Sequence, residues 1–441
     1  MTKAVELCLL CAAAVMMPEA AQSQAVAQQA TEASAPLQMR VAELVAILDG
    51  RGAYDQFFSD EFQRQVPKAQ FDAISAQLKT ALGPIVGVQS VSPVSPHGAT
   101  VVIAFRDGTA TMRIAVDSAA PHRVEGLLIT GTSTPQASLD EVLGRLSSLP
   151  GSTSFALARL GGKEPELLRQ HNANQPAAVG SAFKLIILAE LVRAVDAGER
   201  KWTDVATLDG NPLPGGAYTQ SPKGTAVTLK DLAARMISVS DNSATDILLH
   251  HLGRERVEAM LPRVGIKDPA GMRPFLSTLE LFKLKSVQGG ALGARYAALN
   301  EAGRRAMLAR EVRAEPIEAI DPKLFQDGRP IMIDKLEWFA SAADMVRVMD
   351  WLRRNTERDA TGRTILGLNP GIGGAAADGW QYVGYKGGSE PGVINMTLLL
   401  KAKDGGWYAL ASSWNNPQAA VSDLEFASLV SRAAELSVPG R

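Results

Sequence analysis

Hydrophobic residues recur at helical spacing near the start of the chain and then alternate with polar residues. Spacings of three and four predict helices over residues 39–48 and 66–82. The alternation that follows predicts a run of strands, with a hairpin signal at Asp107-Gly108: residues 85–94, 99–105, 110–116 and 124–129. Helices followed by a strand meander predict a small α+β accessory domain over residues 37–131.

A Ser/Thr/Pro-rich stretch at residues 132–138 is typical of a linker, and a larger region follows it. Apolar residues at helical spacing predict helices at its ends and in its middle: residues 139–149, 181–197, 229–252 and 422–436. Strand-like runs also lie at both ends: residues 154–160, 166–170, 382–385, 393–401 and 407–414. Because both ends supply strands, the pattern predicts an α/β sandwich over residues 139–437, with an antiparallel sheet flanked by helices.

The first residues have the pattern of an export signal. Lys3 precedes an apolar run over residues 7–17, and small residues follow. The run is too short to span a bilayer, so we expect residues 1–25 to be a signal that is cleaved near positions 21–25. Residues 26–36 are then a flexible spacer, and the mature protein is expected to be secreted, in the periplasm, without a membrane span.

Composition narrows the classes of function. The 45 Lys and Arg residues nearly balance the 46 Asp and Glu residues, which gives no reason to expect nucleic acid as a partner. Both cysteines, Cys8 and Cys11, fall inside the signal, so thiolate chemistry is excluded from the mature chain. None of the five histidines stands in a G-x-S-x-G or H-E-x-x-H motif. We therefore expect a small-molecule substrate, no metal and no cofactor.

Ser181-Ala-Phe-Lys184 is an S-x-x-K motif at the start of an apolar helix. Residues three apart lie on one helix face, so the lysine amine can reach the serine hydroxyl. A serine hydroxyl needs a nearby base to act as a nucleophile, and a buried lysine can be that base. The alternative is an ordinary helix N-terminus capped by the serine, and the motif by itself favours this alternative.

Ser240-Asp-Asn242 lies where the helix predicted over residues 229–252 breaks. There the Ser240 hydroxyl can relay a proton to a leaving group, and the Asn242 amide can bind the lysine and a substrate carbonyl. The alternative is a polar turn or a helix cap, which the tripeptide alone favours.

Lys386-Gly-Gly388-Ser389 continues a predicted edge strand. Glycine lets a substrate backbone approach such a strand, and Lys386 adds positive charge. The backbone N–H groups of Ser389 and Ser181 are candidates for an oxyanion hole. A glycine-rich turn between strands is the alternative.

The order of the three motifs decides between these interpretations. S-x-x-K, S-D-N and K-x-G on a late strand together resemble the signature set of class A β-lactamases and related penicillin-recognising serine hydrolases. Residues 181–191 and 227–249 are similar to that family throughout, and the resemblance covers roughly residues 139–437. It implies a β-lactamase/transpeptidase-like fold and an acyl-enzyme mechanism. The roles that it implies are nucleophile for Ser181, proton partner for Lys184, proton relay for Ser240, and substrate or oxyanion binding for Asn242, Lys386, Gly388 and Ser389.

A looser resemblance concerns residues 37–131. Phe57-Phe-Ser-Asp-Glu-Phe62 and Gly126-Leu-Leu are similar to a small cystatin-like or steroid-isomerase-like domain. Such a domain precedes a lactamase-like domain in some two-domain proteins, among them an esterase-like member of clavulanic-acid gene clusters. No catalytic pair is evident in this part of the chain, so accessory packing is its expected role.

Two features depart from the family pattern. Gly387 stands where the family has Thr or Ser, so the hydroxyl that helps to bind a substrate carboxylate is missing, and Ser389 is expected to replace it in part. The segment between the S-D-N and K-x-G motifs is longer than in compact class A enzymes and lacks the usual motif around the deacylating glutamate. Glu315 and Glu318 are candidates for that base; the alternative is surface charge on a long loop.

The sequence therefore predicts an exported serine hydrolase, for which β-lactam hydrolysis is the leading activity. A D-Ala-D-Ala carboxypeptidase or a carboxylic-ester hydrolase would use the same Ser-Lys pair. A non-catalytic sensor that binds penicillin or cell-wall peptides would need only the acylation groups. The outcome depends on whether a base activates water against the acyl-enzyme.

Overall fold

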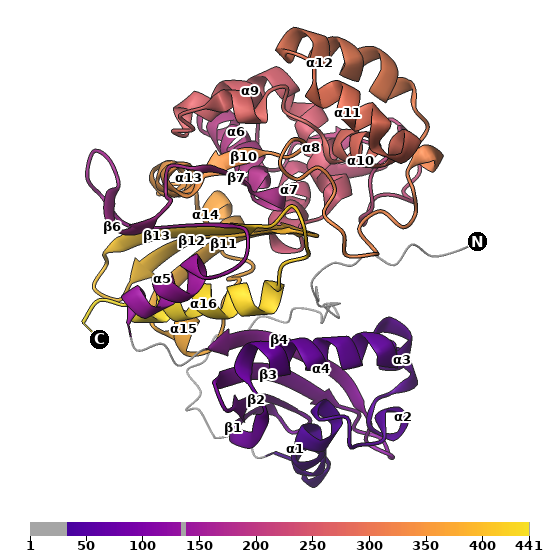
Figure 1. Cartoon of the computed structure of the whole chain (residues 1–441), viewed down its shortest axis with the longest axis vertical. Helices are drawn as coiled ribbons and strands as arrows, with labels where there is room; N and C mark the ends of the chain where they lie inside the picture. The colour runs from indigo at the N-terminus through magenta and orange to yellow at the C-terminus, as the bar shows by residue number, and fades with distance from the viewer. Residues whose placement is uncertain (1–32, 134–137, 441) are drawn as a thin grey trace.

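The computed structural model describes residues 33–133 and 138–440. The predicted signal, residues 1–25, and most of the predicted spacer, residues 26–36, lie outside the described residues and stay predictions. The described chain contains two large sheets (Figure 1). One hydrophobic core lies against the first sheet, and the second sheet has a core on each face.

Four helices and a four-stranded antiparallel sheet form the N-terminal part. They are α1 (Ala35–Leu48), α2 (Tyr54–Phe57), α3 (Asp60–Gln65), α4 (Lys68–Leu82), β1 (Ile85–Ser95), β2 (Gly98–Phe105), β3 (Gly108–Val116) and β4 (Val124–Ser133), with the strands paired in this order. The two helices and four strands predicted here are confirmed, whereas α2 and α3 are too short to give a periodic pattern. Phe105 pairs with Gly108, so Arg106 and Asp107 form the hairpin turn, one residue earlier than predicted.

Helix starts in this part differ from the predicted ones for local reasons. α1 begins at Ala35, within the predicted spacer, because the Ser34 side chain accepts the backbone N–H of Leu37 as an N-cap. α4 begins at Lys68, after Pro67 in the N-cap position, rather than at residue 66. β4 continues to Ser133, into the predicted linker.

A five-stranded antiparallel sheet forms the centre of the C-terminal part. Its order is β11 (Trp380–Glu390), β12 (Val393–Ala402), β13 (Trp407–Asn415), β5 (Ser152–Leu160) and β6 (Glu166–His171). The strands therefore come from both ends of this part of the chain, as the hydrophobic pattern predicts. β11 lies at one edge of the sheet, which is the position predicted for the strand that carries Lys386.

Helices cover both faces of this sheet (Figure 1). α5 (Leu139–Ser147) and α16 (Asp423–Leu436) pack on one face, and α6 (Lys184–Asp196) and α13 (Ala342–Asn355) pack on the other. Alternate strand residues such as Leu398 and Leu399 enter the two cores. The remaining helices and short strands are β7 (Pro176–Ala178), β8 (Val205–Thr207), β9 (Ala226–Thr228), α7 (Leu229–Ser238), α8 (Asn242–Leu252), α9 (Arg254–Arg263), α10 (Thr278–Ser286), α11 (Ala291–Ala297), α12 (Glu301–Met307), β10 (Phe339–Ser341), α14 (Ala360–Leu366) and α15 (Ala375–Asp378).

α16 lies between the large sheet and the N-terminal part (Figure 1). Leu424 near its start packs against the N-terminal core, and the Ser428 hydroxyl lies 2.5 Å from the Thr132 hydroxyl of β4. One helix thus contacts the sheet that carries the predicted site and also the accessory part of the chain.

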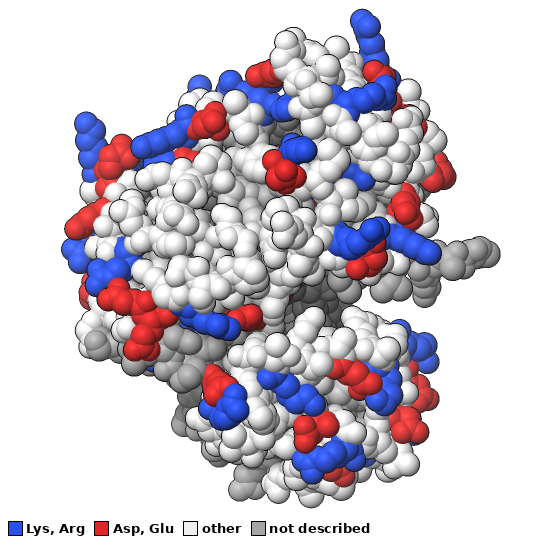
Figure 2. Space-filling model, in the orientation of Figure 1, with Lys and Arg blue, Asp and Glu red and all other residues white. Residues whose placement is uncertain are grey.

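Acidic and basic side chains are interspersed over the face shown in Figure 2, without a large region of one sign. This agrees with the near-neutral composition. Within the described residues, none of the helices combines the length and apolar character that crossing a membrane requires.

Candidate active site

Ser181 lies in a 3-10 turn, Gly180–Phe183, that leads directly into α6. Gly180 has a φ of +47°, and a side chain there would meet the backbone of Gly388 and Ser389 at 3.1 and 3.2 Å, so glycine suits this position for two reasons. The Val179 N–H donates to the Trp338 carbonyl over 3.0 Å, which fixes the chain just before the turn.

Lys184 is fully buried at the start of α6, a helix whose residues are mostly buried, as its apolar sequence predicts. Its Nζ donates to the Ser240 carbonyl over 2.6 Å, to the Ser240 hydroxyl over 3.0 Å and to Asn242 Oδ1 over 2.7 Å. These contacts bring the S-x-x-K and S-D-N motifs together across 56 to 58 residues of sequence.

The S-D-N motif forms the break between α7 and α8. Ser240 has a φ of +58°, a left-handed conformation that costs a non-glycine residue about 1–3 kcal/mol and is uncommon for serine. Asp241 caps α8 by accepting the Ala244 N–H over 2.9 Å, and it also accepts the Ser243 hydroxyl and the Ala217 N–H. Sequence reasoning gave Asp241 no role, although its position before a helix is a recognisable N-cap signal.

β11 brings the third motif to the nucleophile turn. A Cβ atom added at Gly388 would lie 2.2 Å from the Ser181 backbone nitrogen and 2.4 Å from the Val179 carbonyl oxygen. The strand therefore packs backbone to backbone against Gly180 and Ser181. Lys386 is also buried, 3% exposed, and donates to the Gly387 carbonyl over 2.6 Å.

Replacing Gly388 with alanine is expected to lower kcat by about 10²–10³-fold, because the added methyl group displaces the Ser181 N–H, a candidate oxyanion donor. The measurement is steady-state hydrolysis of a chromogenic acyl substrate by the purified variant. Gly144→Ala is the matched control, since a Cβ at Gly144 meets nothing within 4 Å and the helical position favours alanine. Wild-type kcat in Gly388→Ala would contradict the packing argument.

The space at Gly387 is filled by a neighbouring hydroxyl group. A Cβ atom at Gly387 would lie 2.0 Å from the Tyr385 hydroxyl oxygen. Residues two apart on a strand share a face, so Tyr385, Gly387 and Ser389 point the same way. The hydroxyl that the sequence lacks at Gly387 is therefore matched by the Tyr385 phenol, which sequence reasoning missed although the period of two could have shown it.

Ser389 is exposed on β11, and its side chain forms a hydrogen bond to Asp423 at the start of α16. Burial raises the pKa of Asp423 to about 7, and the hydrogen bond from Ser389 opposes part of that shift. The carboxyl group therefore changes charge near neutral pH beside the strand that carries Lys386.

Replacing Asp423 with asparagine is expected to raise the free energy of unfolding by about 2 kcal/mol at pH 8 and to leave it unchanged near pH 4. The folded-state pKa lies above the unfolded value, so the wild type loses stability as pH rises from about 4 through 7, and the variant does not. Urea unfolding at several pH values measures this. Asp140→Asn, where the side chain is 82% exposed, is the control, and an equal gain at pH 4 and pH 8 would refute the prediction.

A buried ionic cluster lies one residue beyond Ser389 on β11. Lys285 Nζ on α10 pairs with Glu337 Oε1 at 2.7 Å and also with Glu390. Burial and the neighbouring Glu337 raise the pKa of Glu390 well above its ordinary value, while the two carboxylates outweigh burial and raise the pKa of Lys285. No local pattern signals this cluster, because its members are 52 and 105 residues from Lys285.

The predicted bases lie elsewhere in the long middle segment. Glu318 is exposed in a 3-10 turn, Ile317–Ala319, and Glu315 is half-buried just before it. Burial lowers the pKa of Lys283 on α10, and the charges of Glu315 and Glu318 oppose part of that shift. The assignment of either one as the deacylating base stays a prediction.

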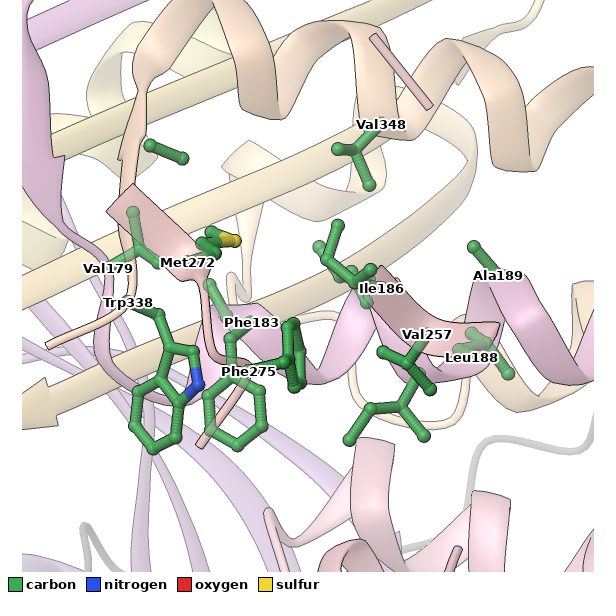
Figure 3. Packing of buried hydrophobic residues seen from close by; sticks show 14 of the residues in the cluster. Val179, Phe183, Ile186, Leu188, Ala189, Val257, Met272, Phe275, Trp338 and Val348 are labelled. Atoms are coloured by element: carbon green, nitrogen blue, oxygen red, sulfur yellow. The ribbon is translucent and has the colours of Figure 1, made fainter. Parts of the chain in front are cut away.

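Aromatic rings pack against Phe183, the last residue of the turn that carries Ser181. Phe183 stacks on Trp338 with ring centres 3.6 Å apart and an interplanar angle of 15°, and it meets Phe275 edge to face (Figure 3). The rings fix the turn that carries Ser181, since Phe183 is its last residue. The arrangement brings a buried lysine, a serine hydroxyl and an asparagine amide together, and Ser181 lies three residues before that lysine, which is suited to acyl transfer.

Comparisons with known proteins identify a family for the C-terminal part of the chain. The profile of the Beta-lactamase enzyme family matches residues 135–436. A beta-lactamase from Sphaerobacter thermophilus DSM 20745 is 20% identical, covers 68% of this chain and 95% of its own, and has a TM-score of 0.45. PBP-A is 14% identical, covers 68% of this chain and 93% of its own, and has a TM-score of 0.45. A beta-lactamase from Chitinophaga pinensis DSM 2588 is 16% identical, covers 68% of this chain and 96% of its own, and has a TM-score of 0.43. No curated protein matches the chain.

Proposed function

Because the chain belongs to the beta-lactamase enzyme family of serine hydrolases, we propose that it hydrolyses β-lactams through an acyl-enzyme on Ser181. The observation that carries this proposal is the position of Lys184, whose buried Nζ contacts both Ser240 and Asn242. Such a lysine can take a proton from one serine and supply it to another.

Acylation follows from these positions. The Ser181 Oγ attacks the lactam carbonyl carbon while its proton passes to Lys184, which must be a neutral amine at this step. The carbonyl oxygen takes up negative charge, which the backbone N–H groups of Ser181 and Ser389 stabilise. As the C–N bond breaks, the Ser240 hydroxyl protonates the leaving nitrogen and is reprotonated by Lys184. Asn242 and Lys386 orient the substrate carbonyl and its anionic group.

Deacylation requires water to attack the ester carbonyl and a base to accept its proton. Glu315 and Glu318 remain the candidates from the sequence. Glu337 and Glu390 are two further candidate bases, because they lie next to Trp338 and Ser389 in the sequence. Both, however, form ion pairs with Lys285. The bond between the carbonyl carbon and Ser181 Oγ then breaks, the proton held by the base passes to Oγ, and the carboxylic acid product leaves.

A second candidate is hydrolysis of a carboxylic ester or of a D-Ala-D-Ala peptide by the same Ser-Lys pair. The Ser389–Asp423 hydrogen bond favours the ester, because an ionised Asp423 beside β11 repels the carboxylate that both a penicillin and a D-Ala-D-Ala peptide carry. Esters without such a carboxylate avoid this repulsion.

Export of the protein to the periplasm and a cystatin-like or steroid-isomerase-like accessory domain form part of the same proposal. The signal pattern of residues 1–25 supports export. The helices and antiparallel strands of residues 35–133 are compatible with such a domain. Its packing against α16 suits a supporting role for the site.

The intact mass of the protein after mixing with benzylpenicillin, followed over time, tests the proposal. A transient adduct with released penicilloate supports a β-lactamase. A lasting adduct supports a penicillin-binding protein instead, and turnover of a neutral ester without any adduct from penicillin supports the esterase. If the protein forms no adduct and releases no product with any of these compounds, the proposal that Ser181 is acylated is refuted.

A further inference from the structure

A cavity of about 510 Å³ lies outside the proposed catalytic centre. It is formed by the segment before α10, by α11 and by the segment before β10, together with Arg304 of α12. None of Ser181, Lys184, Ser240 and Lys386 lines it. Its size is that of a pocket for a small organic molecule.

Two arginines line this cavity without a carboxylate partner. Arg273 and Arg304 are half-buried, and the ion pairs found in the described part of the chain include neither of them. Each has a backbone acceptor for Nη2: the Glu258 carbonyl at 3.4 Å and the Ala297 carbonyl at 3.0 Å. The Nε of each is buried and has no hydrogen-bond acceptor. A buried donor of this kind, left unpaired on a charged group, is costly, so each guanidinium is held beside the cavity without full hydrogen bonding.

The other charges of the lining leave this positive character in place. Glu337 pairs with Lys285 through Oε1, and its Oε2 is buried without a hydrogen-bond partner in the described chain. Asp334 and Lys335 are exposed neighbours of opposite sign. The indole N–H of Trp338, which also lines the cavity, is buried without an acceptor. The lining therefore contains two guanidinium groups without carboxylate partners among the described residues.

We propose that this arginine cavity, defined by Arg273, Arg304 and Trp338, binds a small molecule through a carboxylate or phosphate group. Guanidinium groups bind both oxyanions through paired N–H donors, so the two chemistries share one site. The proposal is independent of the reaction at Ser181. Trp338 lines the cavity and stacks on Phe183, the last residue of the turn that carries Ser181 (Figure 3). A molecule bound in the cavity would therefore contact a ring that packs against this turn.

Isothermal titration of the full chain with succinate at low ionic strength tests the site, with inorganic phosphate and the neutral diamide succinamide as separate titrants. Succinate or phosphate is expected to bind and succinamide is not. Arg273→Gln and Arg304→Gln are each expected to weaken that binding by about tenfold, which corresponds to one lost charged hydrogen bond. The titrant that binds more tightly identifies the oxyanion that the site prefers.

Two controls separate this site from the catalytic centre and from general loss of structure. Arg310→Gln removes an exposed arginine from the neighbouring turn and should leave the affinity unchanged. Ser181→Ala should also bind as the wild type does, whatever its activity. Thermal unfolding confirms that the arginine variants are folded. The proposal is overturned if neither oxyanion binds more tightly than succinamide, or if folded Arg273→Gln and Arg304→Gln bind like the wild type.

Discussion

Replacing Ser181 with alanine is expected to abolish the penicillin adduct and to lower turnover of any acyl substrate by at least about 10⁴-fold, because the proposed mechanism forms the acyl bond on the Ser181 hydroxyl. The Ser181 side chain is half-buried in a turn whose geometry is set by Gly180, Phe183 and the packing of Gly388. Loss of one hydroxyl there should change the free energy of unfolding by less than about 1 kcal/mol. Intact mass and steady-state rates measure the two effects.

The control for this variant is Ser147→Ala, which removes an exposed hydroxyl from α5 far along the chain from the motifs. It should keep the wild-type rate and adduct. An adduct of unchanged mass and yield on Ser181→Ala would show that another residue is acylated, and the proposed mechanism would then be wrong.

Replacing Lys184 with methionine is expected to lower kcat/KM by about 10³–10⁴-fold, the range of a positioned general base. Methionine matches the lysine stem in size but leaves the Ser240 carbonyl, the Ser240 hydroxyl and Asn242 Oδ1 without this donor. The stability cost of those lost bonds is offset by removal of a buried amine, so we expect the free energy of unfolding to change by less than about 2 kcal/mol.

The rate of adduct formation at several penicillin concentrations measures the loss in Lys184→Met, and urea unfolding measures its stability. Lys230→Met, an exposed lysine on α7, is the matched control. If Lys184→Met acylates within tenfold of the wild type, Lys184 is not the base. A rate that falls only together with a large loss of stability would assign Lys184 a structural role.

The periodic pattern predicted most of the elements because they are long and have one regular face. α4, α16 and β12 are clear cases, since each buries a continuous stripe or both faces of a strand. Short elements such as α2 and the 3-10 turn at Ser181 lie below the length at which periodicity is visible. The break at Ser240 was predictable, but its left-handed backbone was not, because a serine in that conformation is held there by its surroundings.

The site residues also divide into those that the sequence predicted and those that only the structure revealed. Ser181, Lys184, Ser240 and Asn242 were found because each pair is close in sequence and forms a known motif. Tyr385, Asp423 and the Lys285–Glu337–Glu390 cluster were missed, because their partners come from separate elements. Gly387 illustrates the consequence: the sequence shows only a missing hydroxyl, whereas the structure places the Tyr385 phenol in that space.

The sequence by itself determined the α/β sandwich, the order of the three motifs and the assignment to a family of serine hydrolases, because local periodicity and short motifs carry that information. The tertiary structure alone decided which groups meet. It joined Lys184 to Ser240 and Asn242, packed Gly388 against the Ser181 backbone, and placed Arg273 and Arg304 around a cavity without carboxylate partners among the described residues. These contacts depend on packing between residues far apart in the chain, and no local pattern encodes such packing.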